Sequence, residues 1–191
     1  MTILDLYEES MKPNFESNVL SRLDTIEQIC IRKESEVKYL KFLSENLKNV
    51  KTVHLHEISR NPANKHTKYF LFEDKYFQHF MSWEHLKTLE IANIYLQAEK
   101  YCNLFLLLQK NLIQITLQNC NLDDKVVLEL SKYSRNLKKM DISGNDELSL
   151  AAYQAISENC PQLEEFKFDS HLEEGEFEWL KNMTHLKHIE I

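Results

Sequence analysis

Glycine and proline are scarce in this chain, and their scarcity limits the kinds of site that it can form. The 191 residues include only 2 glycines and 3 prolines. A phosphate-cradling loop needs several glycines so that its backbone can approach the phosphates closely. The sequence therefore excludes a glycine-rich nucleotide site. With so few chain-breaking residues, regular elements must follow one another through short turns.

Paired cysteines, long apolar runs and an excess of basic charge are also lacking. The four cysteines, Cys30, Cys102, Cys120 and Cys160, contain no C-x-x-C pair, and no secretory leader is visible. Both features predict reduced thiols and a cytoplasmic or nuclear protein. No apolar run approaches the ~20 residues of a membrane span. The net charge of −7 argues against nucleic-acid binding, which needs a basic face.

The sequence is instead rich in one six-residue pattern, apolar-x-x-apolar-x-apolar. This hexad occurs eight times, starting at Met1, Ile26, Val50, Leu86, Leu112, Leu137, Leu163 and Leu186. The start-to-start spacings are 25, 24, 36, 26, 25, 26 and 23 residues, so only the third interval is out of step. A fixed period of this length is typical of solenoid proteins. The long third interval predicts an insertion near residues 57–68.

Each repeat unit changes its hydrophobic period along its length. The last four residues of a hexad alternate between apolar and polar, which predicts a short strand. After the strand, positions such as Leu122, Val126, Val127 and Leu130 fall on one face of a helix. We expect a longer helix over Lys75–Met81, and acidic helix starts at positions such as 146–147.

The repeat period also predicts how the units are arranged. One strand–helix unit cannot bury its own apolar face, so the units must stack into a single parallel sheet covered by helices on one side. The sequence therefore predicts an α/β solenoid over residues 1–191. It is a single domain of about seven to eight repeats, with the sheet on the concave side and the helices on the convex side.

Three stretches carry a resemblance to a known family. They are Asn119–Asp124, the hexad that starts at Leu137, and Asn159–Leu163 with its Cys-Pro-x-Leu sequence. These units resemble leucine-rich repeats, and most closely the cysteine-containing subtype found in F-box proteins. The resemblance implies a horseshoe-shaped leucine-rich-repeat fold and a role in substrate recognition by a ubiquitin ligase, although no F-box is visible. Alternatives in the same fold are a stand-alone scaffold and a regulator of an enzyme such as a GTPase.

No catalytic or metal-binding motif stands out in the chain. The sequence has no G-x-S-x-G, no H-E-x-x-H and no clustered Cys/His set, so we predict that it is not an enzyme and has no cofactor. His54 and His56 alternate on one strand and point to the same side. A metal site there needs a third ligand, for which His66 from the insertion is the candidate. Without a zinc motif, the sequence favours two solvent-facing histidines and no metal site. Cys30, at an outward strand position, is expected to be the most reactive thiol.

The candidate binding residues are the polar side chains that alternate with the buried strand positions. They are Thr52, His54, His56, Thr88, Glu90, Gln114, Thr116, Gln118, Lys139, Asp141, Ser143, Glu165 and Lys167. This mixture of charges and hydrogen-bonding groups suits a protein surface better than a small-molecule pocket. We therefore expect protein partners on the concave face and no nucleic-acid or membrane partner. The terminal strands lack capping elements, which predicts end-to-end contacts with a partner or a second copy.

Overall fold

The computed structural model describes residues 2–6, 14–32, 34–56, 73–94, 102–169, 171–173 and 175–191. These ranges contain one eight-stranded sheet in which the strands follow their order in the sequence. Every neighbouring pair is parallel. The strands are β1 (Thr2–Asp5), β2 (Ile26–Ile31), β3 (Thr52–His56), β4 (Thr88–Ala92), β5 (Gln114–Gln118), β6 (Lys139–Asp141), β7 (Glu165–Lys167) and β8 (His188–Glu190).

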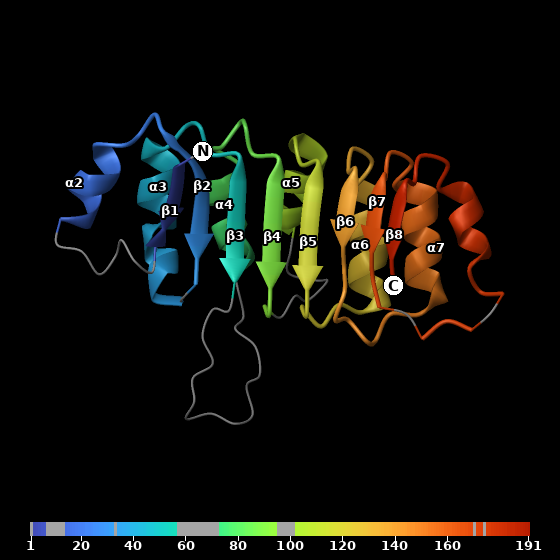
Figure 1. Cartoon of the computed structure of the whole chain (residues 1–191). Helices are drawn as coiled ribbons and strands as arrows, with labels where there is room; N and C mark the ends of the chain where they lie inside the picture. The colour runs from blue at the N-terminus through green and yellow to red at the C-terminus, as the bar shows by residue number, and fades with distance from the viewer. Residues whose placement is uncertain are drawn as a thin grey trace, which may run out of the picture.

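Helical segments link the strands and lie on one side of the sheet (Figure 1). They are α2 (Phe15–Leu20), η1 (Glu34–Tyr39), α3 (Leu40–Asn46), η2 (Asp74–Tyr76), α4 (Phe77–Phe80), α5 (Cys102–Lys110), α6 (Asp124–Tyr133), α7 (Leu150–Asn159) and η4 (Glu178–Asn182). Successive helices pack side by side, as α5 does with α6 and α6 with α7. The sheet stays open because β1 and β8 are not neighbours. The chain is therefore an α/β solenoid with one open parallel sheet and helices along one side, as predicted.

The apolar hexad positions form the core between the sheet and the helices. In the six hexads that start at Ile26 through Leu163, every apolar position is at most 2% exposed. The hexad at Leu186 differs, since Ile189 is 37% and Ile191 is 64% exposed. Ile189 lies on β8, the last strand of the sheet, and Ile191 directly follows it, so no further unit packs over them within the described ranges. Burial of a complete apolar stripe stabilises each inner unit through its neighbours.

A buried asparagine joins two units at the ends of their strands. The Asn145 Nδ2 donates to the carbonyl oxygens of Leu117 (2.9 Å) and Ile142 (2.7 Å). Its Oδ1 accepts hydrogen bonds from the amides of Cys120 and Leu122, both at 3.0 Å. The residue is only 3% exposed, so these bonds satisfy backbone groups that water does not reach. One unit earlier, the Cys120 thiol makes the equivalent contact with the Ile91 carbonyl oxygen at 3.6 Å.

Asparagine also takes the turn positions for which the chain has no glycine. Among the described residues, every non-glycine residue with a positive φ is an asparagine: Asn14 (63°), Asn93 (60°), Asn119 (51°) and Asn121 (52°). Asparagine tolerates the left-handed conformation better than most residues do. Asparagine would not fit at position 144 in place of Gly144, because an added Cβ would lie 2.1 Å from Asn119 Oδ1.

The helix predicted over 75–81 forms as two short segments, the helix predicted to start near residue 146 begins later, and the predicted insertion lies outside the described residues. The helix expected over 75–81 is the single turn η2 followed by the short α4. The chain turns at Met81 so that Trp83, 1% exposed, can enter the core. The helix expected to start near residue 146 begins at Leu150, since Ser149 supplies the cap by accepting from the Ala151 amide. The predicted insertion at 57–68 is not part of the described chain.

Among the described residues, no helix has the length and apolar character needed to cross a bilayer.

Candidate functional site

The predicted binding residues lie on the side of the sheet that the helices leave uncovered, which we call the open face. Along β3 and β5, partly exposed polar residues alternate with fully buried apolar ones. The same alternation places Thr88 and Glu90 of β4 and the outward residues of β6 and β7 on this face. Ser143 follows β6 and donates to Asp141. The structure thus brings the predicted residues together on one surface, and their role in binding stays a prediction.

The parallel register arranges these side chains in rows that run across the strands. One row consists of Thr52, Thr88, Gln114, Lys139, Glu165 and His188. The next row consists of His54, Glu90, Thr116, Asp141, Lys167 and Glu190. Neighbouring strands are ~4.8 Å apart, so a protein lying along a row would touch several repeats at once.

Charges on the open face are paired with one another across neighbouring strands. The Lys139 Nζ lies 2.8 Å from Glu165 Oε1, and the Lys167 Nζ lies 2.8 Å from Glu190 Oε1. These pairs neutralise each other locally. A partner would therefore be selected by the pattern of donors and acceptors rather than by a strong field of one sign.

The open face contains a shallow depression over β5 to β8. Its volume is about 240 Å³, and its polar lining includes Gln114, Thr116, Lys139, Glu165 and Lys167. Small-molecule pockets usually have volumes of roughly 300–1,000 Å³ and mostly apolar walls. The depression is therefore better suited to a side chain of a protein partner than to a metabolite.

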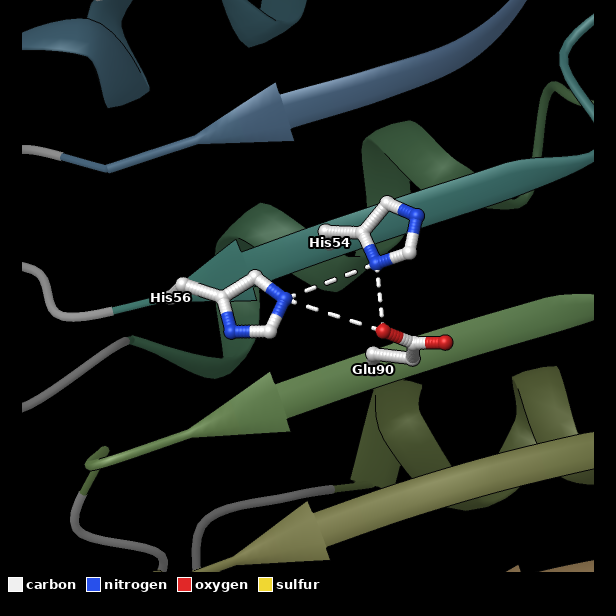
Figure 2. A group of neighbouring side chains, drawn as sticks. All are labelled: His54, His56 and Glu90. Atoms are coloured by element: carbon white, nitrogen blue, oxygen red, sulfur yellow. Dashed lines mark hydrogen bonds and ion pairs between the residues drawn. The ribbon is translucent and has the colours of Figure 1, made fainter.

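A second feature of the open face is a cluster of two histidines and one glutamate on β3 and β4 (Figure 2). The His54 Nδ1 lies 2.5 Å from Glu90 Oε2. The His56 Nε2 lies 3.6 Å from the same carboxylate oxygen and 3.5 Å from His54 Nδ1. The two rings are nearly parallel, with an interplanar angle of 22°. The side chains of His54, Glu90 and His56 are 14%, 25% and 39% exposed.

Hydrogen bonds from the histidines change the chemistry of Glu90. The bond with His54, followed by that with His56, lowers the pKa of the Glu90 carboxyl from its usual 4.5 to about 2. Partial burial opposes this shift but does not cancel it. Glu90 is therefore a carboxylate at every physiological pH.

Neighbouring residues on β2 complete the surroundings of the cluster. The side-chain amide nitrogen of Gln28 lies 2.5 Å from His54 Nε2, on the side of the ring away from Glu90. Cys30 pairs with His54 in the sheet register. Its side chain is buried, with the residue only 8% exposed, and burial raises the pKa of its thiol. This environment opposes the prediction that Cys30 is an especially reactive thiol.

The link between the histidines and Glu90 was missed in the sequence, although a signal for it exists. His54 and Glu90 both occupy the fifth position of consecutive hexads. Parallel strands in register place equivalent hexad positions side by side. His66, the third ligand considered from the sequence, lies outside the described residues.

Comparisons with known proteins give little beyond this geometry. Neither a protein-family model nor a curated protein sequence matches the chain. Among solved structures, the chain is similar to one described as "Crystal structure of Rad7 and Elc1 complex in yeast", with a TM-score of 0.43 and 15% identity. The similarity covers 74% of this chain and 43% of that chain, so it spans less than half of the yeast protein's length. At this level, it carries no information about function.

Proposed function

We propose that the chain is a protein-recognition module that binds its partner through the open face. The observation that carries the proposal is the alignment of polar residues from five consecutive strands, β3 to β7, into rows on a side of the sheet that none of the described helices covers (Figure 1). Lys139 and Lys167 are already paired with glutamates, and the depression over β5 to β8 is shallow. A broad, polar surface of this kind is suited to a protein partner.

The dimensions of the sheet limit the area over which it can contact a partner. Seven strand spacings of ~4.8 Å make the sheet ~34 Å wide, and strands of a few residues at ~3.3 Å each make it ~10–20 Å tall. The projected area is then roughly 500 Å², whereas a specific interface buries ~800 Å² per partner. We therefore expect the partner also to contact the turns at one end of the strands, such as the turn of Ser143 and Gly144.

The test compares what the chain captures from a cell extract of its source organism in three forms. The open-face variant carries Gln114→Ala, Thr116→Ala and Lys139→Ala, all on the uncovered side of the sheet. Asp141 is left intact because its Oδ1 accepts bonds from the Ser143 amide (3.0 Å) and hydroxyl (2.7 Å) and so holds the turn. The control variant changes Lys132, Gln154 and Glu158 to alanine, which are exposed residues of α6 and α7.

We expect to capture proteins that bind the native chain and the control variant but do not bind the open-face variant. Equal circular dichroism spectra and melting temperatures of the three forms would confirm that all are folded. If every captured protein were lost from the control and kept by the open-face variant, the helix layer would be the recognition surface and the proposal would be wrong.

A finer version of the proposal assigns the module to substrate recognition in a ubiquitin ligase. It is supported by the resemblance of Asn119–Asp124 and Asn159–Leu163 to F-box-type repeats. Gel filtration of the purified chain with a Skp-type adaptor and a cullin would test it. A stable ternary complex supports the ligase role. Captured open-face partners without any adaptor complex favour the stand-alone scaffold, and stimulated GTP hydrolysis by a captured GTPase favours the regulator.

A further inference from the structure

We infer that His54, His56 and Glu90 form a binding site for a divalent transition-metal ion, and that Zn²⁺ is the ion they fit best. One ligand atom from each residue points into the same small volume, and all three lie within 4.8 Å of one another (Figure 2). Two imidazoles and one carboxylate form a ligand set that binds zinc in proteins. The inference does not depend on the proposed partner, because all three ligands belong to this chain.

The separations of the ligand atoms agree with a zinc site that needs a small adjustment. In a tetrahedral site with bonds of ~2.0–2.1 Å, two ligand atoms are ~3.3 Å apart. Two of the three separations, 3.5 Å and 3.6 Å from His56 Nε2, are already close to this value. The third, 2.5 Å between His54 Nδ1 and Glu90 Oε2, is a hydrogen-bond distance. It has to widen by about 0.8 Å when an ion replaces the shared proton.

The backbone holds the ligands in place without the ion. His54 and Glu90 are directly paired in the register between β3 and β4, and His56 is two residues further along β3. These strands lie in the middle of the sheet, between β2 and β5. Sites on such rigid elements are better preorganised than sites on loops. Binding the ion therefore requires side-chain rotations only.

Gln28 can act as the outer partner that orients His54. Ligating histidines usually hydrogen-bond through the ring nitrogen that does not bind the metal. His54 Nε2 already has the Gln28 amide beside it at 2.5 Å. Turning that amide by half a rotation brings its oxygen to Nε2, where it accepts the ring proton. The lone pair of Nδ1 then points toward Glu90 and His56, as a metal ligand requires.

The ligand types also decide which ions should bind. Two imidazoles disfavour Ca²⁺ and Mg²⁺, which prefer all-oxygen sites, whereas Cu²⁺ and Ni²⁺ should bind along with Zn²⁺. Glu90 offsets one of the two positive charges of the ion. Three protein ligands leave at least one coordination position, which water can fill from the open face.

Isothermal titration of the untagged, chelator-treated chain with ZnCl₂ tests the inference. We expect one Zn²⁺ per chain and no heat from CaCl₂. His54→Ala, His56→Ala and Glu90→Gln should each weaken zinc binding at least about tenfold. His188→Ala is the matched control, because this exposed histidine lies on β8 of the same sheet and should leave the affinity unchanged.

A second measurement separates a metal site from a merely structural cluster. Gln28→Ala should weaken zinc binding about tenfold, while Gln28→Glu, whose carboxylate also accepts the Nε2 proton, should retain it. Added zinc should raise the melting temperature of the native chain but not that of Glu90→Gln. The inference is wrong if the native chain takes up no stoichiometric zinc. It is equally wrong if the three ligand variants bind zinc as tightly as the native chain does. The same holds if His188→Ala weakens zinc binding as much as the ligand variants do.

Discussion

Asn145 shows how a single buried residue can replace the chain-turning residues that this sequence lacks. Its side chain holds the backbone of two consecutive units through Leu117 and Ile142 on one side and Cys120 and Leu122 on the other. Neither an aspartate nor a leucine can both donate and accept in this way. The short post-strand turns of the solenoid therefore depend on side-chain amides as well as on backbone conformation.

Replacing Asn145 by alanine should destabilise the fold by about 3 kcal/mol or more. The change leaves buried amides and carbonyl oxygens without partners, and each such group costs ~1–3 kcal/mol. Urea denaturation followed by circular dichroism measures the loss. The neighbouring Asp146→Ala is the control, since Asp146 is exposed and its loss should stay within ~0.5 kcal/mol. Equal stabilities of the two variants would show that Asn145 does not join the units.

The predicted binding residues share one face of the sheet, but the contacts between them were not predicted. Alternation along each strand was enough to place His54, His56 and Glu90 on one face. The contact between Glu90 and the histidines depends on which strands are neighbours and in what register. A search along the sequence for a third ligand ignores which strands are neighbours. A comparison of equivalent positions in successive hexads takes the neighbouring strands and their register into account.

At the scale of elements, equivalent positions of neighbouring strands form ladders of charge. Glu164 is the clearest case, because it lies between Lys138 at 2.8 Å and Lys187 at 2.5 Å. Each of the three residues follows the first apolar residue of its hexad. These two lysines lower the pKa of the Glu164 carboxyl from its usual 4.5 to about 2. The ladder joins the last three units of the solenoid outside the core.

The contribution of Glu164 to stability should depend on pH and salt. Because its pKa is lower in the folded chain than in the unfolded one, its ionised form favours folding. The contribution is complete above about pH 4.5 and is lost as the pH falls toward about 2. Urea midpoints of the native chain and of Glu164→Gln should therefore differ slightly at pH 7, converge near pH 2, and approach each other in 1 M salt. A gap that grows on acidification would contradict this pairing.

The hexads themselves can be tested through the sixth of the eight, which starts at Leu137. Leu137 and Ile142 are 0% and 1% exposed and flank β6. Replacing either by alanine should cost about 2–5 kcal/mol, as for other large-to-small core changes. Thermal and urea unfolding measure the effect, with exposed Leu128→Ala on α6 as the control. Unchanged stability of both core variants would contradict the assignment of the hexad as the core.

Strands were easier to predict than helices for a physical reason. A strand such as β5 is fixed by a period of two with apolar residues that must be buried, as Ile115 and Leu117 are. The connecting segments need only cover the core, and several conformations do so. Large side chains such as Phe77 and Phe80 fill the layer with a single turn, so α4 is short. Position in the repeat therefore predicts burial more reliably than it predicts helix length.

At the scale of the whole molecule, the two sides of the sheet have different roles. The helices lie on one side of the sheet (Figure 1), where the buried hexad positions form a continuous core, whereas the other side presents rows of polar residues. Stacking repeats keeps these rows aligned, so each added unit widens the same surface. The proposed zinc site lies at β3 and β4, away from the depression over β5 to β8. The proposed zinc site and the depression are therefore separate positions on the same sheet face.

Carboxyl footprinting of the chain, alone and in complex with a captured partner, tests the open face most directly. Two sets of exposed or partly exposed carboxylates serve as internal probes. On the open face they are Asp141, Glu165 and Glu190, and on the helix layer they are Glu129 and Glu158. Binding through the open face predicts slower labelling of the first set and unchanged labelling of the second. Protection of Glu129 and Glu158, with Asp141, Glu165 and Glu190 unaffected, would show that the partner binds the helices instead.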